Sequence, residues 1–546
     1  MCGILLHYRE DAKLNNFGSE EFGSDRLFKS LVPIIRERGC DYERYELLND
    51  TLQLYSSVLS LRQPLAKQPL IDDRFVIQFN GELYNEDITS AMNDAEFLHN
   101  RLMNLHKGDV EKTIAELVGE FAYTIYDKEL QLIYFGKDIL GRKSLCYSLT
   151  SNGELYVSSC PPFDSNDRVS FEECEKAKIY TYNIAERNLT TLAFDDSEFL
   201  PHSYKVIDDF GAGTHLTDAE AAFKIDKLHS IFTTAVQKRI STIFPLPKDT
   251  TSSKFAILFS GGIDCTLIAG FCGELCERGT CIDLLNVSFS NPRAKLSYDE
   301  TPDRMLAIKS CDGLNQLYNE SRGVKFNLVK INVPYDDYLA TKERVIKLIY
   351  SNDTEMDLSI AIAFYFATSG VNSEGENSDC KVLLSGLGAD EIFGGYTRHE
   401  RIFTGISNQV KRKLKNKPEI DTNEYDLRSL NSELRDELQC DLDRLWERNL
   451  TRDDKVISCW SKEVRYPFLD ETLVKWATSE AGIPLQLKLN YNPATGEITR
   501  KKALRLLAER MGLSFVANEA KRAIQFGSKS AKMDIGSGKV KGTDKL

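Results

Sequence analysis

Short apolar runs separated by turn residues fill the first part of the chain, up to about residue 190. Stretches such as "LQLYSSVLSL", "RFVIQFNGELYN" and "FAYTIYD" combine alternating positions with compact apolar blocks, which is typical of strands. One segment among them, "DAEFLHNRLMNL" at residues 94–105, has the spacing of a helix. The first part of the chain is therefore predicted to be rich in β-structure.

The pattern changes after a polar stretch, "DDFGAGTHLTDAE", which leads into a helical run at residues 219–240. Beyond it, apolar strands such as "FAILFSGG", "DLLNVSFS" and "KVLLSGLG" alternate with helical segments. This alternation predicts a doubly wound α/β domain built on a parallel sheet. The expected boundaries are 1–200 for the first domain, 201–224 for a linker, 225–530 for the second domain and 531–546 for a flexible tail rich in Gly and Lys.

Composition narrows the class of protein. The 546 residues allow two or three domains, and the formal net charge of −13 argues against nucleic acid as a partner. The longest apolar stretch, "LSIAIAFYFA", is too short to cross a bilayer, so no membrane partner is expected. Thirteen Cys residues without a secretion signal indicate reduced thiols and a cytoplasmic location.

A Gly-rich turn follows the first strand of the second domain. In "FAILFSGGIDCT", a buried strand is followed by two glycines and a helix that begins near Asp264. Backbone N–H groups at such a turn can hold a phosphate, and the Asp264 carboxylate favours a magnesium bridge to it. No Gly-Lys-Ser/Thr follows, so the loop is not of the Walker type. On this motif alone, a plain strand–turn–helix connection stays equally acceptable.

A second strand ends in a similar turn. "KVLLSGLGADEIFGGY" carries Asp390 and Glu391 directly after its glycines. The carboxyl ends of parallel strands open on the same edge of a sheet, so Asp264 and Asp390 are expected to lie close enough to hold one metal ion.

The chain opens with "MCGILLHYRE", and Cys2 has two interpretations. Removal of the initiator Met would leave a thiol and a free α-amine on one residue, and the amine can take the thiol proton to give a nucleophile. Alternatively, Cys2 is a small buried apolar residue.

Several motifs in chain order resemble known enzymes. The two Gly-rich loops, "SKEVRYPFLD" and "KKALR" resemble the synthetase domain of the asparagine synthetase family over residues 225–530. The motifs "CGI", "RGCD", "NGELYN", "NDAE", "GEFAY" and "DILGRKSLCY" resemble class II glutamine amidotransferases, which implies an αββα N-terminal nucleophile hydrolase fold. Details such as "SGLGADE", "RNLTRDDKVIS" and "KRAIQFGSKSAKM" are more similar to asparagine synthetase domain-containing proteins than to housekeeping asparagine synthetases.

The resemblance, with the chemistry of the residues, assigns the site. Catalysis is assigned to Cys2 as nucleophile, Asn80 and Gly81 as donors to the oxyanion, and Lys501 as a cation on the phosphates. Glutamine binding is assigned to Asn80, Glu82, Asp94 and Arg62, with Asp94 on the glutamine amine. ATP binding is assigned to Leu258, Ser260, Gly261, Gly262, Asp264, Cys265, Ser288, Ser385 and Gly386, and Mg²⁺ to Asp264 and Asp390.

The resemblance also implies coupled chemistry. Glutamine hydrolysis would release ammonia, ATP would convert a carboxylate to an acyl-adenylate, and ammonia would attack it, with aspartate as the default acceptor. A homodimer is a possible assembly. Two alternatives stay open: an ammonia-dependent synthetase with another carboxylate acceptor, and an ATP-binding or regulatory protein that retains only the fold.

Four positions depart from the family pattern. Val58 replaces the Arg that binds the glutamine α-carboxylate, and Arg62 lies about 13 Å further along at about 3.3 Å per residue, so it can substitute only if the chain turns back. Cys265 stands in place of Ser, and Cys40 in place of Pro. Leu387 replaces a Glu and can neither orient the incoming amine nor accept its proton. We therefore expect slow amidation of aspartate, retained ATP binding and a less polar acceptor.

Overall fold

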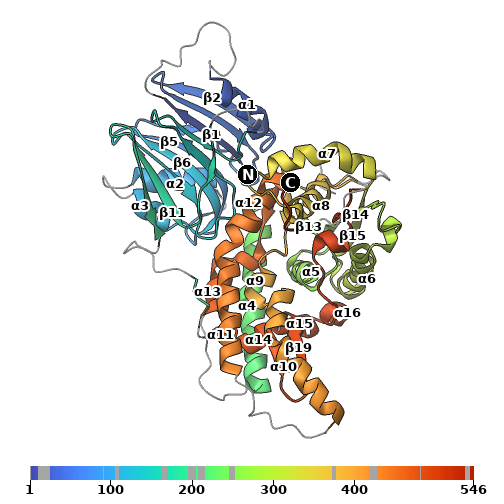
Figure 1. Ribbon diagram of the computed structural model, residues 1–546. Coiled ribbons are helices and arrows are strands. Elements are labelled where there is room, and N and C mark those ends of the chain that lie inside the picture. Colours follow the sequence, from blue (N-terminus) through green and yellow to red (C-terminus); the bar gives the residue numbers. More distant parts are fainter. Residues whose placement is uncertain are drawn as a thin grey trace.

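The computed structural model has two domains that lie side by side (Figure 1). It describes residues 2–9, 25–89, 91–104, 110–162, 169–194, 204–206, 216–244, 253–371, 377–416, 427–479, 481–534 and 541–546. The expected two-domain α/β architecture is confirmed. Helix α4 (Asp218–Ser241) begins inside the segment expected to be a linker, and most of the rest of that segment lies outside the described residues.

The N-terminal domain consists of two antiparallel sheets of six strands each. In spatial order, the first sheet contains β10 (Glu172–Glu173), β8 (Cys146–Leu149), β9 (Leu155–Ser158), β1 (Cys2–Tyr8), β3 (Leu52–Val58) and β2 (Tyr42–Leu48). The second contains β12 (Asn188–Ala193), β11 (Lys178–Asn183), β7 (Leu132–Lys137), β6 (Gly119–Asp127), β5 (Phe75–Leu83) and β4 (Leu70–Ile71).

The two sheets pack face to face, and helices cover their outer faces. Along β1, Ile4 and Leu6 point into the core between the sheets, where they meet Val76 of β5, whereas Leu5 packs with the residues of α1 (Arg26–Arg36). Because both faces of β1 are covered, every residue of this strand is buried. Helices α2 (Asp94–Met103) and α3 (Val110–Ala115) pack with the second sheet, which completes the αββα order expected for this domain.

The C-terminal domain is built on a fully parallel sheet. Its spatial order is β15 (Lys325–Val333), β14 (Cys281–Phe289), β13 (Phe255–Leu258), β16 (Val382–Leu384) and β17 (Glu463–Arg465). The chain proceeds from β13 toward one edge and then returns to the other side of β13 through β16. A crevice therefore opens at the carboxyl ends of β13 and β16, which is where doubly wound sheets bind ligands.

Helices cover both faces of this sheet. Helices α5 (Ile263–Leu275) and α6 (Pro302–Arg322) pack together, and α8 (Glu355–Ser369) packs with α7 (Tyr335–Leu348) and α12 (Thr451–Ser458). The remaining elements are η2 (Tyr298–Glu300), α9 (Ala389–Phe393), α10 (Thr397–Asn416), α11 (Leu427–Leu445), η4 (Trp446–Leu450), η5 (Pro467–Leu469), α13 (Glu471–Thr478), α14 (Leu485–Lys488), β18 (Leu489–Asn492), β19 (Glu497–Arg500), α15 (Lys502–Arg510), α16 (Ser514–Ala517) and α17 (Ile524–Gly527). No helix among the described residues is long and apolar enough to cross a membrane.

The last six residues differ from the expectation of a flexible tail. Residues 541–546 run beside the start of α8, where the Met356 amide donates to the Gly542 carbonyl at 2.9 Å and the Leu546 amide to the Asp353 carbonyl at 2.8 Å. Backbone groups at the first turn of a helix lack partners within the helix, and this segment supplies some of them. Residues 535–540 lie outside the described residues.

Candidate active site

Cys2 begins β1 at the edge of a small pocket in the N-terminal domain. Its backbone N–H donates to Asn80 Oδ1 at 2.8 Å, and Gln68 Nε2 donates to its Sγ at 3.3 Å. The Asn80 Nδ2 atom is buried and has no hydrogen-bond partner among the described residues. An unpartnered donor beside the thiol is what a developing oxyanion needs, so the expected role of Asn80 fits this geometry.

Gly81 and Gln68 shape the same pocket. Gly81 has φ of +141°, and a Cβ there would lie 1.9 Å from the Glu120 carbonyl oxygen, so only glycine lets β5 approach β6 this closely. The Gln68 side chain accepts a hydrogen bond from the Phe79 amide at 2.6 Å while it donates to Cys2. No role for Gln68 could be predicted from the sequence, because its amide lies close to Cys2 only in the folded chain.

Burial raises the pKa of the Cys2 thiol, and the nearby carboxylates of Glu463 and Asp94 raise it further. The positive charge of the chain's N-terminus acts in the opposite direction. A buried thiol of this kind needs a base to become a nucleophile. Removal of Met1 would turn the nitrogen that Asn80 holds into a free amine that can serve as this base.

The chain does turn back after Val58, as Arg62 requires. Arg62 Nε lies 3.2 Å from Asp94 Oδ2, and its Nη2 lies 3.2 Å from Glu82 Oε2. All three side chains are buried and line the pocket of Cys2. Burial, with the Glu82 charge, raises the pKa of Asp94, and the Arg62 guanidinium acts in the opposite direction. The cavity measures about 20 Å³, room for about one water molecule, so glutamine can enter only if the pocket widens.

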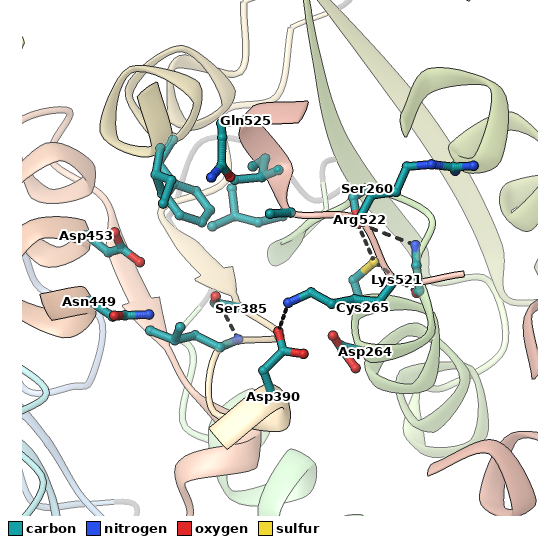
Figure 2. Close-up of a pocket in the computed structure, with 18 of the residues that line it drawn as sticks. Ser260, Asp264, Cys265, Ser385, Asp390, Asn449, Asp453, Lys521, Arg522 and Gln525 are labelled. Atoms are coloured by element: carbon teal, nitrogen blue, oxygen red, sulfur yellow. Dashed lines mark hydrogen bonds and ion pairs between the residues drawn. The ribbon is translucent and has the colours of Figure 1, made fainter. Parts of the chain in front are cut away.

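A larger pocket of about 380 Å³ opens at the carboxyl ends of β13, β14 and β16 (Figure 2). Most of the residues assigned to ATP line it: Leu258, Ser260, Gly262, Asp264, Cys265, Ser385 and Gly386. Gly261 does not line the pocket. It has φ of +78°, and a Cβ there would lie 2.4 Å from the Ala307 nitrogen, so it permits the turn instead.

Ser288 does not line this pocket either. Its hydroxyl donates to the Tyr298 carbonyl at 2.9 Å and lies 2.8 Å from the Thr301 hydroxyl, away from the ATP loop. Val287, one position earlier on β14, lines the pocket instead. Leu285, Asn286 and Val287 line the pocket in succession, so the pocket ends one residue before Ser288.

Asp264 and Asp390 meet at the end of the sheet, with Lys501 between them. Lys501 Nζ lies 2.7 Å from Asp264 Oδ2 and 2.7 Å from Asp390 Oδ1. Lys521 pairs with the other Asp390 oxygen (Figure 2). Burial acts to raise the pKa of Asp390, but the two ammonium groups outweigh it and hold that pKa well below its usual range. Two carboxylates from two strand ends provide oxygen ligands of the kind Mg²⁺ takes.

Other residues of this pocket had no role in the sequence analysis. Lys521 and Arg522 come from the segment before α17, Gln525 from α17 itself, and Asn449 and Asp453 from the junction of η4 and α12. These residues belong to the motifs "KRAIQ" and "RNLTRDD", which indicated only a resemblance to relatives and no role for single residues. Their place in the pocket depends on tertiary packing, which the chain pattern does not reveal.

Buried charges connect the two pockets across the domain interface. Glu82 Oε1 lies 2.7 Å from Arg465 Nη2, and Arg465 Nε donates to Glu463 Oε1 at 2.7 Å. The Ser385 amide, in the ATP loop, donates to the Arg465 carbonyl at 3.0 Å. Arg465 therefore contacts the glutamine pocket through its side chain and the ATP pocket through its backbone.

Comparison with known proteins agrees with the two domains. The family described as Asparagine synthase matches residues 250–537, and the Glutamine amidotransferase domain matches residues 1–211. The chain is 28% identical to "Asparagine synthetase domain-containing protein 1" of Homo sapiens, with 98% of this chain and 96% of that protein covered. It is 26% identical to "Putative asparagine synthetase [glutamine-hydrolyzing] 1" of Methanocaldococcus jannaschii, with 86% and 80% covered.

A third relative has a clearer match. The chain is 39% identical to "Asparagine synthetase domain-containing protein YML096W" of Saccharomyces cerevisiae, with 100% of this chain and 99% of that protein covered. The two family matches have the same order along the chain as the two domains of the fold. The chain therefore belongs to the asparagine synthetase family, among its asparagine synthetase domain-containing members.

Proposed function

We propose that this protein is a glutamine-dependent, ATP-consuming amide synthetase that works in the cytoplasm. The observation that carries the proposal is the convergence of Asp264, Asp390 and Lys501 beside a 380 Å³ pocket at the switch point of the parallel sheet. The name of the M. jannaschii relative supports the same chemistry. Aspartate is the default acceptor, and another carboxylate is the alternative.

The first half-reaction uses Cys2 and Asn80. The Cys2 thiolate attacks the carboxamide carbon of glutamine, and the α-amine of Cys2, held by Asn80 Oδ1 at 2.8 Å, takes the thiol proton. Asn80 Nδ2 donates to the oxyanion that forms. Ammonia leaves, and water hydrolyses the thioester to glutamate.

The second half-reaction uses the ATP pocket. The turn at Ser260 and the start of α5 receive the phosphates through backbone N–H groups. Lys501 and Lys521 bring positive charge to the same phosphates, while Asp264 and Asp390 would hold Mg²⁺, which neutralises the departing pyrophosphate when bound. An oxygen of the acceptor carboxylate attacks the α-phosphorus, pyrophosphate leaves, and ammonia replaces AMP at the acyl carbon.

A test combines pure protein with ATP, magnesium and aspartate, and supplies either glutamine or ammonia. Pyrophosphate and amide product should both appear with either nitrogen source. Absence of acceptor-dependent pyrophosphate with either source would overturn the synthetase half of the proposal. Glutamate formation without amide would leave only a glutaminase.

One observation favours a second candidate, a synthetase that uses free ammonia. The glutamine pocket is closed to about 20 Å³, and Arg62 is paired with Asp94 and Glu82 inside it. If this closed arrangement persists with ATP bound, ammonia would support synthesis and glutamine would not. The two nitrogen sources in the test above separate the two functions.

A further inference from the structure

One wall of the ATP pocket carries Asn449 and Asp453, where η4 leads into α12. Figure 2 shows both side chains on the side of the pocket opposite Asp264, Cys265 and Lys521. Phosphates belong at that latter side, beside the Gly-rich turn and the paired lysines. The wall of Asn449 and Asp453 therefore borders the space left for the acceptor.

The Asp453 carboxylate is partnered through one oxygen. Arg452 donates from Nε to Asp453 Oδ1 at 2.8 Å, and its Nη2 lies 2.8 Å from the same oxygen. No described residue donates a hydrogen bond to Asp453 Oδ2, although the residue is only 2% exposed. Burial raises the pKa of Asp453 to about 6, so the carboxylate is still ionised at neutral pH. Asp453 Oδ2 lies in the pocket wall without a donor among the described residues, so a bound cation can partner it.

Among the described residues, Arg452 has the one buried guanidinium of this wall, and two carboxylates already pair with it. Arg452 Nη1 lies 3.2 Å from Asp357 Oδ1, so the group is held between Asp357 and Asp453. Two carboxylates and one guanidinium give the wall a net negative charge, which disfavours a second substrate carboxylate there. Arg444 and Arg448 also line the pocket, but both are exposed at its mouth.

The surroundings of the wall are apolar. Leu387, Ile360, Phe364 and Leu445 line the same pocket, and Leu387 stands where asparagine synthetases carry an acid. This apolar surface lies beside the Asp453 oxygen and beside Glu391, whose Oε2 also lacks a hydrogen-bond partner among the described residues. Such a lining suits a ligand with a short apolar body and an ammonium group.

We infer that the acceptor is an aminocarboxylate whose ammonium group binds Asp453 Oδ2 and Asn449 Oδ1, while its carboxylate faces the α-phosphorus of ATP. This inference rests on the proposed function. The acceptor carboxylate oxygen forms a bond to the α-phosphorus, the bond to pyrophosphate breaks, and the ammonium group keeps its protons. A second carboxylate, such as the α-carboxylate of aspartate, has no buried cation on this wall.

Four small carboxylates test the inference, because they differ by one group each. β-Alanine is aspartate without its α-carboxylate, succinate is aspartate without its ammonium group, and propionate lacks both. Exchange of labelled pyrophosphate into ATP reports adenylation of each acceptor. We expect β-alanine to exceed propionate at least about tenfold and succinate to be the poorest, since a charge-assisted hydrogen bond to a buried carboxylate is worth about a factor of ten or more.

Asp453→Asn keeps the size of the side chain and removes its charge, so the preference for β-alanine over propionate should fall about tenfold. Asp443→Asn is the matched control, because Asp443 is exposed on α11, pairs with Lys176 and does not line the pocket. Its preference should be unchanged. Equal exchange with propionate and β-alanine, or an unaltered preference in Asp453→Asn, would overturn the inference.

No exchange with any of the four acceptors would instead count against the proposed synthetase. The site is then tested by calorimetric titration of β-alanine into protein that holds a non-hydrolysable ATP analogue. Saturable binding that Asp453→Asn loses and Asp443→Asn keeps would support the inference. Absence of such binding in the unmodified protein would overturn it.

Discussion

Arg62 Nε lies 3.2 Å from Asp94 Oδ2 inside the pocket of Cys2, although the two residues come from a loop and a helix far apart in the chain. Both groups were expected to bind glutamine, Arg62 at its α-carboxylate and Asp94 at its α-amine. Here they neutralise each other instead. Glutamine carries an α-carboxylate and an α-amine on one carbon atom. Its carboxylate can take the place of Asp94 beside Arg62, and its amine can take the place of Arg62 beside Asp94.

The first prediction concerns Arg62. Arg62→Leu should raise the KM for glutamine at least about tenfold, because the α-carboxylate loses its cation and Asp94 loses its buried partner. Ammonia-dependent synthesis should be nearly unchanged. Arg44→Leu, which breaks an exposed pair with Glu46, is the control. An unchanged KM for glutamine in Arg62→Leu would contradict the assignment.

The second prediction concerns Cys2. Cys2→Ala should remove all glutaminase activity and leave ammonia-dependent synthesis in place, because the ATP pocket belongs to the other domain. The free amine that Asn80 would hold requires removal of Met1, which mass spectrometry of the native protein can measure. Retained Met1 in active protein would count heavily against this mechanism.

The sequence predicted what depends on chain order and strand direction. Two Gly-rich turns after two parallel strands were enough to place Asp264 and Asp390 at one edge of a sheet, and both pair with Lys501 there. Ser288 shows the limit of this reasoning. The carboxyl end of β14 contributes Leu285, Asn286 and Val287 to the pocket, and the sequence pattern does not show at which residue the pocket ends.

Other parts of the site lie in motifs that matched relatives but indicated no role for single residues. Gln68, Asn449 and Asp453 reach their pockets through the packing of loops and helix junctions, and the chain pattern does not fix side-chain direction there. The position of Arg62 could not be predicted either. The residues after Val58 are compatible both with a continued strand and with a loop that turns back. The departures from the family pattern at Val58 and Leu387 indicated two altered positions of the site, but only the fold showed which residues surround them.

The third prediction concerns magnesium and ATP. Asp264→Ala should weaken binding of ATP in the presence of magnesium at least about tenfold, because one of the two converging carboxylates is lost. Without magnesium the same variant should bind ATP no more weakly than the unmodified protein, since the carboxylate repels phosphate. Calorimetric titration under both conditions measures this difference. Unchanged affinity with magnesium would mean that the loop has another role.

The fourth prediction concerns the pH dependence of stability. Burial raises the pKa of Asp303 to about 8 from an ordinary value of 3.8. Between these values the folded state holds a proton that the unfolded state lacks, so the free energy of unfolding falls as pH rises, by up to about 1.4 kcal/mol per pH unit. Asp303→Asn removes this contribution. Denaturant unfolding between pH 5 and pH 8 should show a flatter profile for the variant, and an identical slope would contradict the prediction.

The last prediction concerns Leu387, which lines the ATP pocket where asparagine synthetases carry Glu. A carboxylate there can orient the incoming amine or accept its proton, and leucine can do neither. Ammonia attack on an aspartyl-adenylate should therefore be slow in this protein, while ATP binding is retained. Leu387→Glu should raise aspartate-dependent amide formation about tenfold or more if this step limits the rate, with pyrophosphate exchange as the control for adenylation.

The size of this effect also separates the two reasons for a poor aspartate reaction. If the missing acid at 387 is the limiting defect, Leu387→Glu accelerates amide formation and leaves pyrophosphate exchange unchanged. If the wall of Asp453 excludes the α-carboxylate of aspartate, exchange itself is slow, and Leu387→Glu adds a further negative charge to the same pocket and makes it slower. Should the unmodified protein make asparagine from glutamine at about 1 s⁻¹ or faster, both reasons fail, and Leu387 is a tolerated substitution.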